Sequence, residues 1–197
     1  MNGITFNKDI YVVEGFDLVG KGAFIEKYMD KFMIYQADNN KAIDDTNRWV
    51  ADLSVLNFLE QMYKSRLAAR LQPRVILDSS ILSSQVNLRI FQNKMPDQNI
   101  LKQFKEYKYF TEGVGHIYLK HKSIENARII FDKYKSIPNP NETTKKSLDK
   151  FKTFDAYWLF YSSAEQMYAR FYQDLGITPR IFEIDIDSND FTEVTED

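Results

Sequence analysis

Short apolar runs alternate with longer amphipathic stretches along most of the chain. Runs typical of strands buried in a parallel sheet occur at residues 10–14, 33–36, 74–78, 114–120 and 180–187. Apolar residues at helical spacing predict helices over about 20–32, 49–71, 81–91, 124–134 and 154–175. This alternation predicts an α/β fold, a three-layer αβα sandwich in which helices cover both faces of a parallel sheet.

The connections suggest one domain over residues 1–197 with one polar insertion. Residues 136–146 contain two prolines, several asparagines and a Lys-Lys pair, and they predict a polar loop that is mobile and resembles a lid, around 135–150. The acidic residues after 187 are expected to fray.

The first strand is followed by the most informative motif in the chain. Residues 11–22 read Tyr-Val-Val-Glu-Gly-Phe-Asp-Leu-Val-Gly-Lys-Gly, which contains the Gly-x4-Gly-Lys pattern of a phosphate-binding loop, or P-loop. In such loops the backbone N–H groups and the helix N-terminus face phosphate oxygens, and the lysine adds a mobile positive charge. The residues expected to bind the nucleotide cofactor are Gly15, Phe16, Asp17, Leu18, Val19, Gly20, Lys21, Gly22 and Ala23.

One part of this motif is missing. The position after the lysine is expected to carry Ser or Thr, whose hydroxyl binds magnesium, but Gly22 and then Ala23 follow here. Asp78 ends the third predicted strand, at the sheet edge where open α/β proteins bind ligands. It is therefore the expected magnesium ligand.

Composition narrows the possible classes of function. The chain has 197 residues, a net charge of -2 and no cysteine, which argues against a nucleic-acid binder and excludes thiol chemistry. The two histidines, His116 and His121, are too few to suggest a zinc site. No apolar run is long enough to span a membrane, and residues 1–10 lack the apolar core of a signal peptide, so we expect a cytoplasmic protein.

Four collinear segments resemble the thymidylate kinase branch of the P-loop nucleoside and nucleotide kinases. Residues 13–21 are similar to the family's Glu-Gly-x-Asp-x-x-Gly-Lys, and residues 75–84 to its Val-Ile-x-Asp-Arg-Tyr-x-x-Ser-Ser. Residues 117–127 resemble its Tyr-Leu-x-x-x-x-Glu-x-Ala, and residues 176–187 lie where the family has its last strand. The likeness covers almost the whole chain in order and spacing.

The resemblance implies transfer of a phosphoryl group from ATP, with Mg²⁺, to a deoxynucleoside monophosphate. It implies that Lys21 contacts the ATP phosphates, that Asp17 lies at the acceptor and that Asp78 organises the metal. Arg128 lies on the helix that carries the family's lid arginine, slightly displaced, and is the candidate cation over the transferred phosphate. The remaining candidates for acceptor contacts are Glu14, Trp49, Ser79, Ser83 and Ser84.

The acceptor site departs from the family pattern. Ser79 replaces the arginine expected after Asp78, and Leu53 occupies the position near which an arginine would read thymine. The acceptor base therefore stays open. Trp49 and Phe16 are candidates to touch a nucleobase, and core packing is an equal alternative for both.

Two other functions stay open beside the nucleotide kinase. A deoxynucleoside kinase would use Glu14 or Asp78 to accept the proton of the sugar hydroxyl. A degenerate kinase fold would bind a nucleotide or a protein without turnover, as the missing Ser or Thr at position 22 suggests. The expected partners are a nucleoside or nucleotide and, through the helix at 49–71, a second copy of the chain in a homodimer.

Overall fold

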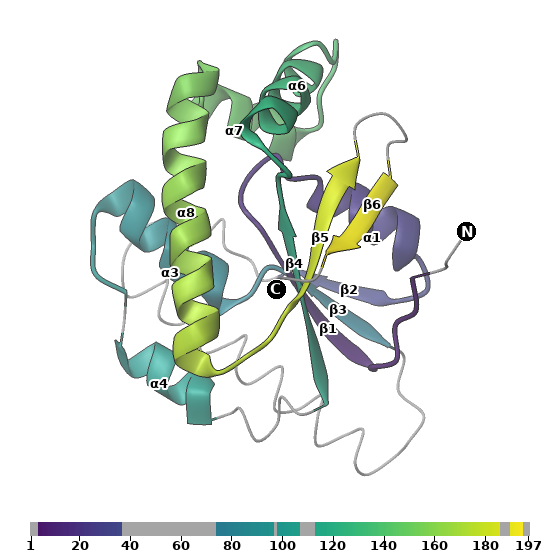
Figure 1. The fold of residues 1–197 in the computed structure, drawn as a ribbon, viewed down its shortest axis with the longest axis vertical. Coiled ribbons are helices and arrows are strands. Elements are labelled where there is room, and N and C mark those ends of the chain that lie inside the picture. The colour runs from purple at the N-terminus through teal and green to yellow at the C-terminus, as the bar shows by residue number, and fades with distance from the viewer. Residues whose placement is uncertain (1–3, 37–73, 97, 107–112, 186–189, 195–197) are drawn as a thin grey trace.

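The computed structural model describes residues 4–36, 74–96, 98–106, 113–185 and 190–194 (Figure 1). The strands are β1 (Ile10–Glu14), β2 (Met33–Gln36), β3 (Val75–Asp78), β4 (Val114–Lys120), β5 (Arg180–Asp185) and β6 (Asp190–Val194). The helices are α1 (Lys21–Tyr28), α3 (Ile81–Gln92), α4 (Gln98–Glu106), α6 (Ile124–Lys135), α7 (Glu142–Lys150) and α8 (Phe154–Leu175).

These strands form one sheet in the order β2-β3-β1-β4-β5-β6. The first five strands in this order run parallel to their neighbours, as the sequence predicts, and β6 pairs antiparallel with β5 at the edge. The chain leaves β1 toward β2 and later returns to β4 on the other side of β1. The carboxyl end of β1 is therefore a topological switch point, where open α/β sheets bind ligands.

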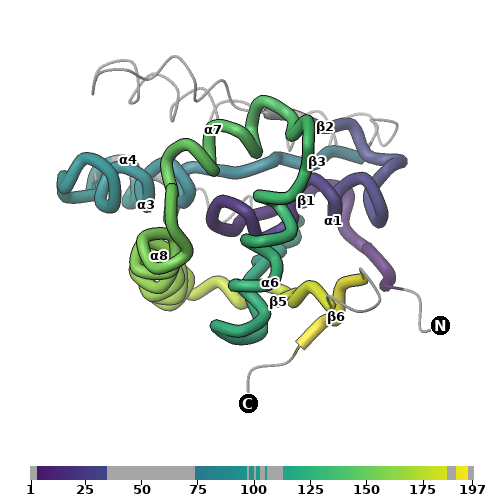
Figure 2. Tube along the Cα trace, turned by 90° about the horizontal axis from the view of Figure 1, so that it is seen from above, coloured from purple at the N-terminus to yellow at the C-terminus, as the bar shows by residue number. Residues whose placement is uncertain are grey.

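The register of the parallel strands assigns side chains to the two faces of the sheet. Tyr118 on β4 contacts Tyr168 and Tyr172 of α8. The next register position pairs Leu119 with Phe182, and Phe182 packs against Phe24 of α1 on the opposite face. Because successive residues of a strand point to opposite faces, α8 and α1 cover different sides. The three-layer αβα sandwich is confirmed, and Figure 2 shows α1 and α8 well apart.

Two segments correct the sequence-based expectations. Residues 142–150 belong to helix α7 instead of the expected loop, because Asn141 caps the helix by accepting from the Thr144 N–H at 2.8 Å and Glu142 lies in its first turn. Within the acidic tail, which the sequence predicts to fray, residues 190–194 form β6. Its Glu193 forms a two-point ion pair with Arg180 of β5, at 2.6 and 2.7 Å.

One helix ends earlier than the sequence predicts, and another was not predicted. Helix α1 ends at Tyr28 and not near Phe32, and α4 has no counterpart among the predicted helices. The helix expected at 49–71, with Trp49, Leu53 and the proposed dimer interface, lies outside the described residues, as does the end of the last strand expected at 186–187.

Candidate functional site

The loop between β1 and α1 has the backbone shape that its glycines allow. Gly15 has φ +151°, and a Cβ there would come within 2.8 Å of the Leu119 carbonyl oxygen. Gly20 has φ +85° and forms the N-cap of α1. Any larger side chain at either position would strain the loop. The loop therefore presents the N-terminus of α1 at the carboxyl end of the sheet, as a phosphate site requires.

Lys21 crosses from α1 to the end of β3. Its Nζ donates a hydrogen bond to Ser79 Oγ at 2.6 Å and lies 3.9 Å from Asp78 Oδ1. Asp78 is paired in register with Val13, so it lies on the α1 face of the sheet with Lys21. Both charged side chains keep about a fifth of their surface exposed, at 22% and 23%. The two strongest site predictions thus lie side by side at the switch point.

Glu14 lies on the other face and is enclosed. Its carboxylate accepts hydrogen bonds from the Ser80 N–H at 2.9 Å and from the Ser80 and Ser83 hydroxyls. Ser83 Oγ is also hydrogen-bonded to Tyr168 of α8 at 2.7 Å. Burial raises the pKa of Glu14 above its ordinary value, because it desolvates the charged form. This carboxyl joins β1 to the start of α3 and has no exposed surface for a substrate.

Asp17 is held by α7 and α8. Its carboxylate accepts from Lys150 Nζ of α7 at 3.0 Å, and its backbone oxygen accepts from the Tyr157 hydroxyl of α8 at 2.9 Å. The Lys150 ammonium also lies 4.0 Å from the centre of the Phe91 ring, a favourable cation–π distance. The loop therefore has a second cation beside Lys21, supplied by the helix that the sequence analysis expected to be a loop.

Several side chains predicted for the site are packed in the core or contact other elements instead. Phe16 is only 3% exposed and stacks on Phe91, so its ring packs in the core and is closed to a nucleobase. Arg128 places its guanidinium over the Phe154 ring at 4.2 Å and 3.8 Å from Asp155, at the start of α8. Ser83 and Ser84 are buried in α3, and Ser79 alone of the predicted serines keeps a partly exposed position.

The position of Gly22 leaves room for a side chain. A Cβ added there would meet no other atom within 4 Å, and both Gly22 and Ala23 are exposed. The position of the missing hydroxyl is thus free of steric obstruction. Among the described residues no three His, Cys, Asp or Glu side chains are grouped as a metal site. A single carboxylate such as Asp78 fits Mg²⁺ only where phosphate and water oxygens complete the coordination.

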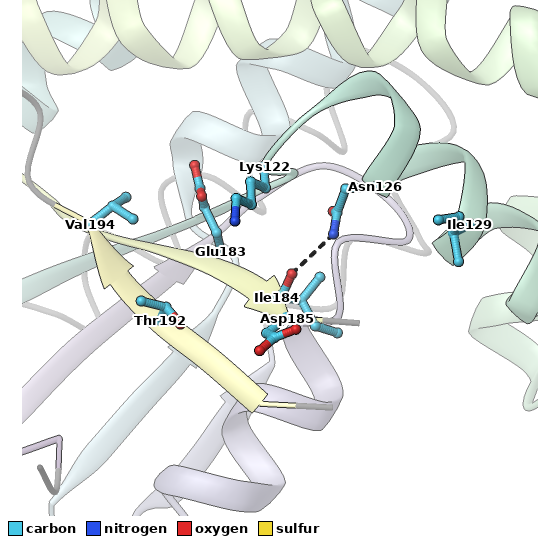
Figure 3. A pocket seen from close by; sticks show the side chains of 8 residues that line it. All are labelled: Lys122, Asn126, Ile129, Glu183, Ile184, Asp185, Thr192 and Val194. Carbon is cyan, nitrogen blue, oxygen red and sulfur yellow. Dashed lines mark hydrogen bonds between the residues drawn. The ribbon is translucent and has the colours of Figure 1, made fainter. Parts of the chain in front are cut away.

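A pocket of about 360 Å³ lies between the start of α6 and the β5–β6 hairpin (Figure 3). It is lined by Lys122, Asn126, Ile129, Glu183, Ile184, Asp185, Thr192 and Val194. Ile184 also borders the loop between β1 and α1, because its Cδ1 is 3.7 Å from the position that a Cβ on Gly20 would take. The pocket therefore adjoins the loop at the N-terminus of α1.

Comparison with solved structures identifies the fold. The YorR protein from Bacillus subtilis, in complex with phosphorylated GDP, is similar with a TM-score of 0.52 and 13% identity, over 88% of this chain and 85% of that chain. The chain therefore shares the αβα fold of that protein. No model of a protein family matches the sequence, and no curated protein does.

Two structures of the deoxyadenosine kinase from M. mycoides also match, with lower scores. The structure with bound dATP has a TM-score of 0.46 and 12% identity, over 91% of this chain and 94% of that chain. The structure with the products dCMP and a flexible dCDP has 0.43 and 15%, over 90% and 91%. Separately, no helix within the described ranges is long and apolar enough to cross a membrane.

Sequence reasoning did not single out Lys150, which the structure places against Asp17 of the loop. Lys150 stands in a polar segment where its neighbours Lys145 and Lys146 are equally plausible, and only the packing of α7 selects it.

Proposed function

We propose that this chain is a P-loop phosphotransferase that moves the γ-phosphoryl group of ATP to a deoxynucleoside monophosphate. The observation that carries the proposal is the placement of Lys21 between Ser79 and Asp78, beneath a glycine loop at the switch point of the sheet. A lysine, a carboxylate and a helix N-terminus at one sheet edge form an arrangement suited to neutralising polyphosphate charge. The thymidylate kinase-like branch is proposed on the resemblance of the sequence motifs.

The residues around the loop divide the binding of the phosphates between them in this proposal. The N–H groups of the loop and of α1 bind the β- and γ-phosphates, and Lys21 exchanges Ser79 for a phosphate oxygen. Lys150, on α7, is the second cation near the loop and compensates charge as the phosphoryl group moves. Arg128 is directed to Phe154 and Asp155 at the start of α8, whereas Lys150 already contacts Asp17 of the loop, which makes Lys150 the better candidate.

Magnesium would be held by Asp78 together with phosphate and water oxygens. The ion would supply charge neutralisation between the phosphates. Asp78 is suited to this because its carboxylate is partly exposed and faces Lys21 at the loop. The absence of a hydroxyl at positions 22 and 23 leaves the protein with fewer metal ligands than the motif normally has.

The state of Glu14 supports a monophosphate as acceptor over a nucleoside. A nucleoside kinase needs a carboxylate that reaches the sugar hydroxyl, but Glu14 is buried and bonded to Ser80 and Ser83. Of the two candidate bases, Glu14 and Asp78, only Asp78 stays accessible. In this proposal Asp78 pairs with Lys21 and binds the metal, so it does not serve as the base. Asp17, partly exposed at the loop, is the proposed contact to the acceptor.

A second candidate function is nucleotide binding without turnover. The exposed Gly22 and Ala23 favour it, because a loop that binds phosphates through backbone N–H groups needs no metal-binding hydroxyl for affinity alone.

Coupled ADP release with magnesium and ATP, measured against a panel of deoxynucleosides and their monophosphates, tests the proposal. We expect turnover with one or more monophosphates, and we expect Lys21→Ala to lower it by a factor of about 10² to 10³, as for the loss of one preorganised charge contact. Lys31→Ala, an exposed lysine just after α1, is the matched control and should keep full activity.

The outcomes separate the candidates. Turnover that survives Lys21→Ala undiminished would show that the proposed mechanism is wrong. If no acceptor of the panel gives ADP release, but calorimetry detects ATP binding that Lys21→Ala abolishes, the result would support binding without turnover. Turnover with nucleosides alone would support the deoxynucleoside kinase and contradict the argument from Glu14.

A further inference from the structure

The hydroxyl of Tyr157, a fully buried residue of α8, contacts the backbone of the phosphate loop. It donates a hydrogen bond to the backbone oxygen of Asp17 at 2.9 Å and lies 2.6 Å from His121 Nε2. A carbonyl oxygen only accepts hydrogen bonds, so Tyr157 donates to Asp17 and accepts from His121. Burial lowers the pKa of His121 to about 4, because it desolvates the charged form, so the ring is neutral and carries its hydrogen on Nε2. The single hydrogen of the Tyr157 hydroxyl is thereby directed to the loop.

The peptide that accepts this hydrogen bond precedes a strained residue. Leu18 has φ +65°, a left-handed conformation that is unfavourable for a residue with a side chain. Turning the Asp17–Leu18 peptide by half a rotation would bring φ of Leu18 to a negative value, which leucine prefers. The same rotation would carry the Asp17 oxygen away from Tyr157 and break the hydrogen bond. The bond therefore opposes this relaxation of the loop.

The orientation of this peptide decides which group the loop offers to a phosphate. The peptide is trans, so its C=O and N–H groups point in opposite directions. Because the carbonyl is bonded to α8, the Leu18 N–H points away from α8, which covers the face of the sheet opposite to α1 and Lys21. Among the described residues, none accepts a hydrogen bond from this N–H. After a half rotation, the peptide would present its carbonyl oxygen there, which repels a phosphate.

We propose that Tyr157 is a positioning residue of the phosphate loop, whose hydroxyl holds the Asp17–Leu18 peptide so that the Leu18 N–H binds a phosphate oxygen of the nucleotide. This rests on the proposed binding of nucleotide phosphates by residues 15–22. Asp17 is held twice, at its backbone by Tyr157 and at its carboxylate by Lys150 of α7, at 3.0 Å. A donor fixed in advance needs no reorganisation when the phosphate arrives. Helix α8 thus contributes to phosphate binding without touching the ligand.

Calorimetric titration of the full chain with inorganic tripolyphosphate tests this, together with the NMR amide signal of Leu18 in protein that carries isotope-labelled leucine. We expect tripolyphosphate to move the Leu18 amide proton downfield in the unmodified protein. In Tyr157→Phe, which lacks only the hydroxyl, affinity should fall about three- to ten-fold, as for the loss of one hydrogen bond, and the movement of the Leu18 signal should shrink. Tyr172→Phe is the matched control, because it removes a buried hydroxyl of the same helix that has no hydrogen-bond partner among the described residues. Both readouts should stay as in the unmodified protein.

The outcomes distinguish this role from the proposed function. If the unmodified protein binds tripolyphosphate but the Leu18 amide signal does not move, the role of this peptide is overturned while the phosphate loop remains the binding site. Unchanged affinity in Tyr157→Phe, or an equal loss in Tyr172→Phe, would overturn the role of Tyr157. Absence of binding by tripolyphosphate and ATP alike would overturn the proposed function and this inference with it. The Leu18 measurement in the unmodified protein needs no variant to fold.

Discussion

At the scale of single residues, the site has the lysine of the Gly-x4-Gly-Lys pattern but not the hydroxyl that normally follows it. Lys21 is positioned by Ser79 and Asp78, so its charge is in place before any ligand binds. Gly22, one residue later, is exposed and unobstructed. The absence of the hydroxyl is therefore a matter of side-chain identity alone, because the backbone around it has the form that a hydroxyl-bearing residue would adopt.

Restoring the hydroxyl is expected to strengthen metal-dependent chemistry. Gly22→Ser should raise turnover at limiting magnesium and lower the magnesium concentration needed for half-maximal rate, since the added Oγ can bind the ion. It should also stabilise the fold by a few tenths of a kcal/mol to about 1 kcal/mol, because glycine disfavours a helix. Gly22→Ala is the control for the helix effect. Identical magnesium dependence in both variants would contradict the prediction.

Glu14 predicts how the free energy of unfolding depends on pH. Burial raises the pKa of Glu14 above its ordinary 4.5, although the Ser80 and Ser83 hydroxyls and Lys21 act in the opposite direction. Above pH 4.5 the unfolded chain releases this proton while the folded chain retains it. The contribution of Glu14 to stability is thus full below pH 4.5 and falls as the pH rises toward the folded-state pKa.

Glu14→Gln, which cannot ionise, should remove this decline. Relative to the unmodified protein, the variant should gain stability as the pH is raised from 4 to 8, measured as urea unfolding midpoints. Glu26→Gln, at an exposed position on α1, is the control and should follow the unmodified protein. A Glu14→Gln profile parallel to that of the unmodified chain would show that Glu14 titrates normally.

At the scale of elements, α7 connects the polar insertion to the loop. The pair between Lys150 and Asp17 is 3.0 Å long, and the two side chains are 42% and 31% exposed. Exposed pairs of this kind contribute about 0–1 kcal/mol to stability. The pair therefore contributes little to the stability of the fold, and the role proposed for Lys150 is charge compensation at the loop.

Lys150→Met removes the charge, and with it the cation–π contact to Phe91, but keeps an unbranched side chain at this position. We expect turnover to fall by about ten-fold or more while the free energy of unfolding changes by less than about 1 kcal/mol. Lys146→Met, on the same helix and paired with Glu142, is the control and should leave turnover unchanged. Equal losses in the two variants would mean that Lys150 acts only as surface charge.

At the scale of the whole molecule, the sheet brings β1, β3, α1 and α7 together at one edge. A ligand bound there contacts elements that are distant in sequence, so it should stabilise the complete fold. At an ATP concentration of about 100 times Kd, the gain is about 2.7 kcal/mol, and a chain of this size gains roughly 2–4 °C per kcal/mol. The expected rise in Tm is therefore about 5–11 °C.

Thermal unfolding followed by circular dichroism, with and without magnesium and ATP, measures this shift. Lys21→Ala should abolish most of it, and sodium chloride at matched ionic strength is the control for general salt effects. A shift of the same size in Lys21→Ala would show that ATP binds away from the loop.

The sequence alone determined the elements with strong local signals. The buried apolar runs predict the strands, and the spacing of Gly15, Gly20 and Lys21 predicts a phosphate loop, in which both glycines adopt the positive φ that other residues disfavour. Residues 33–36 and 114–120 match the strands β2 and β4 at both ends. Polar segments carry weaker signals, so α7 and β6 were predicted as a loop and a frayed tail. The Asn141 cap contributes to the stability of α7, and pairing with β5 and the Arg180–Glu193 ion pair contribute to that of β6.

Only the tertiary structure decided which of the chemically equivalent residues act together. Glu14 and Asp78 both end predicted strands, but the register turns Glu14 toward α8 and Asp78 toward α1 and Lys21. Lys150 reaches Asp17 across 133 positions of sequence, and Arg128 turns to the start of α8. Local sequence fixes the type of each element, whereas the direction of a side chain depends on which element packs against it.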